Sequence, residues 1–302
     1  MTPKMKFFLS ALFFICWSFP AFCQINGLLI DAKTKQGIPY VNIWVANKSI
    51  GTTALENGTF ILPELDSTRT LVFSAIGYET KYLSSDSIAN EIILHPSITQ
   101  LEEIVVRTSK KSQEMVIGQL KKSKIKAYFS CGRSPWIAAR FFPFNPAYQA
   151  TPYLKKIKVL AESDIKSATF LIRLYNVNDK GEPEGYLYNK NIYGAAKKGN
   201  KFTEINLSHL AIPFPDNGFF IAIEWLIIPS NKHEYTYTMA GSKKKLQGIS
   251  YEPSIGTIPS ETNENSWLFI GGSWVKVWDT ETNLKNYKKK YNLLGIELTL
   301  GN

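Results

Sequence analysis

Few residues of this 302-residue sequence have the types and spacing that catalysis or metal binding requires. The three histidines, His95, His209 and His233, stand apart, and none belongs to a pair that would bind zinc from one face of a helix. The sequence contains neither a Gly-x-Ser-x-Gly nucleophile elbow nor a glycine loop that would cradle a phosphate before a helix. We therefore predict plain surface histidines, no metal, no cofactor and no catalytic residue.

Paired carboxylates are another route to chemistry, because a glycosidase holds two of them roughly 5–10 Å apart across a cleft. Glu182 and Glu184 are close in sequence but lie in a polar turn. Glu224 lies inside the apolar run 219–225, so it either points outward from a strand or is buried with a partner. One such carboxylate does not make an acid–base pair. We predict that the protein is not an enzyme, with a glycoside hydrolase as the remote alternative.

The segment 176–182 partly mimics a calcium-binding loop, since it alternates oxygen-bearing side chains and contains a glycine. Its first position holds the neutral amide of Asn176, and Lys180 adds a positive charge. Calcium requires several oxygen ligands at once. This segment is therefore predicted to be a simple hairpin turn.

Aromatic residues give the best indication of a binding site. Within Ser273–Trp278, Trp274, Lys276 and Trp278 share one face of a predicted strand, and the two valines between them share the other. If the valines point inward, two flat rings flank a lysine on the surface, an arrangement that suits stacking on sugar rings. The alternative is that these tryptophans belong to a core, as large aromatics usually do. We predict Trp274, Lys276 and Trp278 as the ligand-binding residues.

Charge and cysteine content restrict the class of protein further. Residues 24–106 carry five Lys/Arg and nine Asp/Glu, whereas residues 107–302 carry 28 and 16, so the basic excess belongs to the second part alone. Such a surface favours an acidic glycan or an anionic membrane surface, or it is simply a solvated basic face. Beyond residue 23 only Cys131 remains, which excludes a disulfide framework and suits a small buried side chain. We predict no nucleic-acid partner.

Residues 1–23 have the pattern of a secretory signal peptide. Lys4 and Lys6 precede the apolar run 7–19, which is shorter than the ~20 residues that span a bilayer, and Pro20 ends it. We predict cleavage after Cys23. The alternative, acylation of Cys23 in a lipoprotein signal, is disfavoured by the large Phe22 before it. The chain is thus expected to be exported, to the periplasm, the outer-membrane surface or the extracellular space, with peripheral membrane association as an option.

Residues 24–107 read as a complete small β-sandwich of short strands with turn residues between them. The strand and turn segments that indicate this are, in order, Ile25–Asp31, Gly37–Ile43, Gly51–Thr53, Asn57–Phe60, Leu71–Thr80 and Leu101–Val106. Their order and spacing resemble the carboxypeptidase-regulatory-like domain, a transthyretin-like sandwich found at the N-terminus of TonB-dependent receptors and other envelope proteins. The resemblance implies an envelope protein and no chemistry in this domain. Fewer than 200 residues follow, too few for the receptor's 22-stranded barrel.

The remaining chain divides into a basic linker, 108–126, and a second β domain, 127–302. In the linker, Met115, Val116, Ile117 and Leu120 could line one side of a short helix, which would pack on its own domains or lie on a membrane surface. From Tyr128 onward, eight to ten predicted strands and no sustained helical period indicate a jelly-roll-like sandwich. Its family is not recognisable.

The sequence therefore predicts an all-β protein of two β-sandwich domains. The leading hypothesis for its function is a binding or adhesion module of the cell envelope, with a glycan or another envelope protein as ligand. The rival is a structural or assembly component of an outer-membrane complex that docks through the sheet edge of its N-terminal sandwich.

Overall fold

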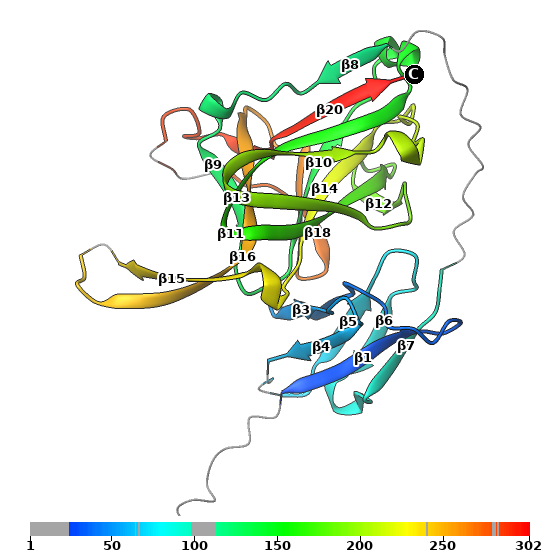
Figure 1. Cartoon of the computed structure of the whole chain (residues 1–302), viewed down its shortest axis with the longest axis vertical. Helices are drawn as coiled ribbons and strands as arrows, with labels where there is room; N and C mark the ends of the chain where they lie inside the picture. The colour runs from blue at the N-terminus through cyan, green and yellow to red at the C-terminus, as the bar shows by residue number, and fades with distance from the viewer. Residues whose placement is uncertain are drawn as a thin grey trace, which may run out of the picture.

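The computed structural model describes residues 24–63, 65, 67–97, 113–239, 241–279, 282 and 284–302. Strands form nearly all of its regular structure, and they gather into a smaller N-terminal unit and a larger C-terminal unit (Figure 1). The expected fold class, all-β with two β-sandwich domains, is confirmed. Within the described residues, no helix has the length and apolar character to cross a membrane. The expected signal peptide, with Cys23, and the expected strand Leu101–Val106 lie outside the described residues.

The N-terminal unit packs two small sheets against each other. One has the order β4-β1-β7 and the other β3-β2-β5-β6. The strands are β1 (Ile25–Asp31), β2 (Asn42–Val45), β3 (Gly51–Thr53), β4 (Thr59–Leu62), β5 (Thr70–Ser74), β6 (Lys81–Ser84) and β7 (Glu91–Leu94), with a 3-10 turn η1 (Ser85–Ser87). Alternate side chains of β2, β4 and β7 point inward, and Leu29, Ile43 and Phe73 are fully buried between the sheets.

The turn at Asn57–Gly58 joins the two sheets of this unit. Gly58 has a φ of +85°, the left-handed conformation that favours glycine. Gly37 faces the turn so closely that an added Cβ would lie 2.0 Å from the backbone oxygen of Asn57. The glycines at 37 and 58 therefore allow two backbone segments to touch.

The C-terminal unit is one hydrogen-bonded network in the described part of the chain. Its main path is β15-β16-β11-β14-β10-β17-β18; β12, β13 and β20 pair with β11, β9 and β19 pair with β16, and β8 pairs with β20. The strands are β8 (Glu114–Ile117), β9 (Ala127–Cys131), β10 (Ile137–Phe142), β11 (Tyr153–Val177), β12 (Pro183–Tyr186), β13 (Ile192–Asn206), β14 (Phe219–Trp225), β15 (Lys232–Thr238), β16 (Lys245–Ser260), β17 (Ser266–Ile270), β18 (Ser273–Lys276), β19 (Tyr291–Leu294) and β20 (Ile296–Gly301). The 3-10 turns are η2 (Lys122–Lys124), η3 (Pro146–Ala150), η4 (Ser208–Leu210) and η5 (Pro229–Asn231).

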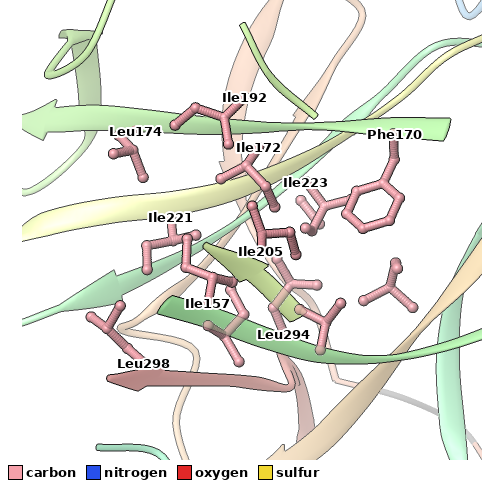
Figure 2. Close-up of a cluster of buried hydrophobic side chains, with 14 of the residues drawn as sticks. Ile157, Phe170, Ile172, Leu174, Ile192, Ile205, Ile221, Ile223, Leu294 and Leu298 are labelled. Atoms are coloured by element: carbon pink, nitrogen blue, oxygen red, sulfur yellow. The ribbon is translucent and has the colours of Figure 1, made fainter. Parts of the chain in front are cut away.

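The 25-residue strand β11 belongs to both layers of this sandwich. Its first half pairs with β20, its second half pairs with β14, and the register shifts between Ser163 and Ser167, where the strand bends. The apolar side chains inside the fold come from both halves and from the strands that face them (Figure 2). Ile157, Phe170, Ile172, Ile223 and Leu298 are all fully buried there.

The described residues 113–126 form no α-helix, although the sequence is compatible with one there. Residues 114–117 form β8, which pairs with β20, and η2 follows it; residues 108–112 are not described. Met115 and Ile117 are half-buried against the core, so the apolar pattern here has a period of two. The edge of β20 offers backbone hydrogen-bond partners, and pairing with it outweighs the helical pattern of four apolar residues.

Candidate functional site

The two units contact each other through side chains that both contribute. The ring of Trp44 in β2 packs edge-on against Phe269 in β17 with 5.8 Å between ring centroids. Nearby, the hydroxyl of Ser134 donates a hydrogen bond to the backbone oxygen of Ser49. The backbone N–H of Ile227 donates a hydrogen bond to the hydroxyl of Thr53 over 3.0 Å. The interface is thus part apolar and part hydrogen-bonded.

Glu224 is at the centre of this interface. In β14, Ile221 and Ile223 point into the main core, whereas Phe220, Ala222 and Glu224 alternate with them on the opposite face. That opposite face is also covered, by aromatic side chains and by the N-terminal unit, so all seven residues of β14 are buried. Glu224 is 3% exposed. Of the two readings of Glu224, burial with a partner is the one that the structure shows.

The partners of Glu224 come from both units. The Nε atom of Arg173, on the neighbouring strand β11, donates to one carboxylate oxygen, and the side-chain amide of Asn42 in β2 donates to the other. Arg173 also donates through Nη1 to Asn191 Oδ1 over 2.5 Å. A buried ion pair is tolerated when hydrogen bonds satisfy its remaining atoms, as here. Asn42 thereby ties the N-terminal unit to a charge pair inside the C-terminal one.

Burial and neighbouring charges shift the pKa values of Arg173 and of two tyrosines in this cluster. Burial alone would lower the pKa of Arg173, but the adjacent Glu224 carboxylate, together with Tyr186 and Tyr175, raises that pKa above its ordinary value. Burial raises the pKa of Tyr175 well above its usual range, and Tyr186 and Glu224 add to the shift. Burial also raises the pKa of Tyr186. The two phenols therefore stay neutral beside the Arg173–Glu224 pair.

A cavity of about 220 Å³ opens beside this pair, between the two units. Aromatic and polar side chains line it together: Trp44, Tyr175, Tyr186, Phe269 and Trp274, with Asn42, Ser74, Thr80, Arg173 and Glu224. The Trp274 ring is held edge-on by Tyr175 and Phe269, at centroid distances of 5.3 and 5.2 Å. The side-chain oxygen of Asn42 is buried without a hydrogen-bond partner among the described residues. Flat apolar walls and fixed hydrogen-bonding groups are the two components of a site for a small polar ligand.

The same cavity is poorly equipped for hydrolysis. Among its described lining residues Glu224 is the only carboxylate, and Arg173 and Asn42 occupy its two oxygens. Glycoside hydrolysis requires a second carboxyl group across the cleft. The arrangement can bind and orient a ligand, but it lacks an acid–base pair.

The structure keeps Trp274 and Lys276 on one face of β18 but places Trp278 elsewhere, so the three predicted residues do not form one exposed platform. Trp274 is half-buried in the inter-unit cavity. Lys276 ends β18, and its Nζ lies 4.1 Å from the centroid of the Trp267 ring. Trp278 follows the strand, is 62% exposed, and lines a different, apolar hollow of about 310 Å³. Val275, expected to point inward, is 38% exposed.

This separation has a physical cause. In the described network β18 is an edge strand, and the face that carries Trp274 and Lys276 lies on the aromatic cluster with Phe269 and Trp267 rather than on solvent. The strand ends at Lys276, so the alternation does not continue to Trp278.

The loop 176–182, Cys131 and two of the three histidines have the structural roles that the sequence predicts. In residues 176–182, Asn178 Oδ1 accepts the backbone N–H groups of Lys180 and Glu182, which confirms the hairpin turn between β11 and β12. Cys131 is buried, and burial raises its pKa to about 12, as a structural cysteine requires. His95 and His209 are exposed as expected.

His233 is not the plain surface residue that the sequence suggested. Its side chain is 26% exposed, and its Nδ1 lies 3.4 Å from Glu252 Oε1 and 3.7 Å from Asp164 Oδ2. These carboxylates lie in β16 and β11, so the sequence around His233 contains no motif that would predict the cluster.

Comparison with known proteins assigns the N-terminal unit only. No curated protein matches the sequence. Two solved structures of infectious bursal disease virus, of the Gx strain and of the T13 particle, share 11% identity with the chain at a TM-score of 0.25. They align with 94% and 87% of this chain, which spans 58% and 57% of theirs, and a likeness this weak bears on neither fold nor function. The family model of the CarboxypepD_reg-like domain matches residues 25–106, so this part of the chain is a CarboxypepD_reg-like domain, a β-sandwich module of the kind associated with the cell envelope.

Proposed function

We propose that this protein is an exported, non-catalytic binding module of the cell envelope that holds one sugar unit of a glycan in the cavity between its two sandwiches. The observation that carries the proposal is the cavity lining, in which the rings of Trp274, Tyr175 and Trp44 stand beside the buried Arg173–Glu224 pair. Export and envelope location rest on the signal-like residues 1–23 and on the CarboxypepD_reg-like domain.

Size and chemistry favour a saccharide. A volume of about 220 Å³ is below the ~300–1,000 Å³ of pockets for drug-sized ligands, so it suits one sugar ring. The C–H face of a sugar packs on an aromatic ring, and its hydroxyls exchange hydrogen bonds with fixed polar groups. Asn42 Oδ1 supplies an acceptor without a partner in the described residues.

Preorganisation supports binding rather than turnover. The Trp274 ring is already held by Tyr175 and Phe269, and both oxygens of Glu224 are fixed by Asn42 and Arg173. A ligand that enters such a site orders few side chains, which reduces the entropic cost of binding. The absence of a second lining carboxylate among the described residues favours a non-catalytic role.

A glycan array tests the proposal with the wild-type chain and two variants. Trp274→Ala removes a cavity wall, whereas Trp278→Ala removes an exposed ring outside the cavity and is the matched control. We expect a subset of glycans to bind wild type and Trp278→Ala, and to lose at least about tenfold in affinity with Trp274→Ala, as for a stacking residue worth roughly 1.5 kcal/mol. Circular dichroism of each variant controls for folding. Equal binding by Trp274→Ala and wild type would refute the site, and a flat array would refute the glycan.

A second candidate function is assembly with another envelope protein. A larger groove of about 700 Å³ runs between β1 and β4 of the N-terminal unit and the segment around η5 in the C-terminal one. β4 is an edge strand in the described sheet, and Ile61 on it is 61% exposed. An exposed sheet edge beside an apolar groove can accept an extended segment of a partner. Capture of one defined protein from envelope extract, abolished by Ile61→Lys and with a flat glycan array, would favour this function.

A further inference from the structure

Three potential metal ligands meet where the long β15–β16 hairpin leaves the body of the C-terminal unit (Figure 1). His233 is the second residue of β15, Glu252 lies in β16, and Asp164 lies in the bend of β11. His233 Nδ1 is 3.4 Å from Glu252 Oε1 and 3.7 Å from Asp164 Oδ2, and the three donor atoms all lie within 4.8 Å of one another. None of them lines the cavity proposed to hold a glycan.

The fold brings these residues together for identifiable reasons. β16 pairs with β15 beside His233 and with β11 beside Asp164, so Glu252 lies between two neighbouring strands. The bend of β11 is shaped by Ser163, whose hydroxyl accepts the backbone N–H of Ile165 over 3.3 Å. The bend projects Asp164 outward toward the hairpin. The β15–β16 hairpin and the distant strand β11 thus converge on one point.

The burial of the three side chains is graded. Glu252 is buried, with only 7% of its surface exposed. The Ser250 hydroxyl donates a hydrogen bond of 3.3 Å to Glu252. The side chain of His233 is 26% exposed and that of Asp164 is 71% exposed. A buried carboxylate with so little hydrogen bonding is stabilised by a cation, and the exposed side leaves a path for one to enter.

We propose that Asp164, His233 and Glu252 bind one divalent transition-metal ion, with zinc as the best fit. Donor atoms that surround a tetrahedral zinc at 2.0–2.2 Å lie about 3.3–3.6 Å apart, close to the 3.4 and 3.7 Å observed here. The third distance joins the carboxylates of Asp164 and Glu252, and a small rotation of the exposed Asp164 side chain would shorten it to the same range. Two carboxylates balance the charge of the ion, and the imidazole selects zinc over calcium and magnesium.

Metal binding would fasten the foot of the hairpin to the body of the protein. One face of the hairpin carries a row of rings from His233 through Tyr235 to Tyr237, with centroids 5.9 and 6.0 Å apart. Because the imidazole that begins this row would be a ligand, the ion would link β15 to both β11 and β16. The proposed zinc ion would thus hold the hairpin against the body of the C-terminal unit, and this proposal is independent of the glycan proposal.

Zinc titration of the tag-free, chelator-treated chain tests the proposal. We expect one zinc per chain by calorimetry, an affinity at least tenfold weaker in His233→Ala and in Asp164→Asn, and no change in His209→Ala, which removes an exposed histidine elsewhere. Asp164 is exposed, so its replacement does not disturb the core. Cobalt substitution should give the visible spectrum of a tetrahedral ion in wild type and lose it in Asp164→Asn.

Several results would overturn the site. The first is that wild type binds zinc no more tightly than Asp164→Asn does. The second is that neither His233→Ala nor Asp164→Asn changes the affinity for zinc. The third is that wild type binds calcium more tightly than zinc. The last result would show an oxygen site in which the imidazole takes no part. Absence of any metal binding would show that the three side chains only pack against one another and form no metal site.

Discussion

Breaking the buried Arg173–Glu224 pair should destabilise the protein far more than removing the pair as a unit. The side chains are 3% and 4% exposed, so neither charge reaches water when its partner is lost. Glu224→Gln keeps the shape of the side chain and leaves the guanidinium uncompensated. Removal of one partner of a buried pair costs about 3–5 kcal/mol, because a charge stays buried without compensation.

The double variant Arg173→Met/Glu224→Gln separates this explanation from a general loss of packing. It leaves no buried charge, and the amide at position 224 can still accept the hydrogen bond from Asn42. Its expected loss is that of one unsatisfied amide donor, about 1–3 kcal/mol. We therefore expect the double variant to be more stable than Glu224→Gln, with a coupling free energy of at least about 2 kcal/mol.

Urea unfolding followed by circular dichroism and tryptophan fluorescence measures these differences, and two probes are needed because two domains can unfold separately. Glu204→Gln is a matched control: its ion pair with Lys156, at 3.3 Å, is solvent-exposed and should be worth less than about 1 kcal/mol. Losses in the double variant equal to the sum of the two single losses would refute the reasoning. So would a Glu224→Gln loss no larger than that of Glu204→Gln.

Three further predictions concern other parts of the chain. A hydrogen bond from a backbone N–H lowers the pKa of Asp31 to about 2. The stability that the Asp31 carboxylate contributes is therefore present above the unfolded pKa of ~3.9 and is lost as the pH falls toward 2. Asp31→Asn should lower the melting temperature at about pH 6, and the difference from wild type should shrink below about pH 3. Cys131, with its pKa raised to about 12, should react with a thiol reagent at about pH 8 only as fast as the protein unfolds, and labelling of the native state within minutes would contradict its burial. Gly37→Ala should cost at least about 1–3 kcal/mol in urea unfolding because its Cβ meets Asn57 O at 2.0 Å, whereas Gly132→Ala, with open space around it, should be close to neutral.

The class of fold could be predicted from local patterns. Alternating apolar residues and turn residues predict the sandwich of the N-terminal unit, and the apolar run 219–225 corresponds to the fully buried strand β14. Local pattern failed at residues 114–120, where the spacing of four apolar residues is compatible with a helix but residues 114–117 form strand β8. The free edge of β20 decides their structure, and β20 lies at the other end of the chain.

The site was less predictable, because its parts come from both domains. Trp274 is predicted from the sequence as a ligand contact, but no local pattern indicates that the N-terminal sandwich lies beside it. Arg173 and Glu224 each interrupt an apolar strand with a charge of opposite sign, and this complementarity was the available signal for the pair. Asn42 and the aromatic rings of Tyr175 and Tyr186 carried no comparable signal.

The structure changes the role expected of the CarboxypepD_reg-like domain. A domain with no chemistry of its own could serve only to place the chain in the envelope, and the activity would then belong to the C-terminal sandwich. Yet Asn42 and Trp44, both in its β2, form part of the cavity wall, and Asn42 holds one oxygen of Glu224. If the cavity binds the ligand, neither sandwich alone contains the site, and any change that separates them removes binding without touching the C-terminal residues. Binding and the docking of the two sandwiches are then one equilibrium, so the ligand itself should stabilise the interface.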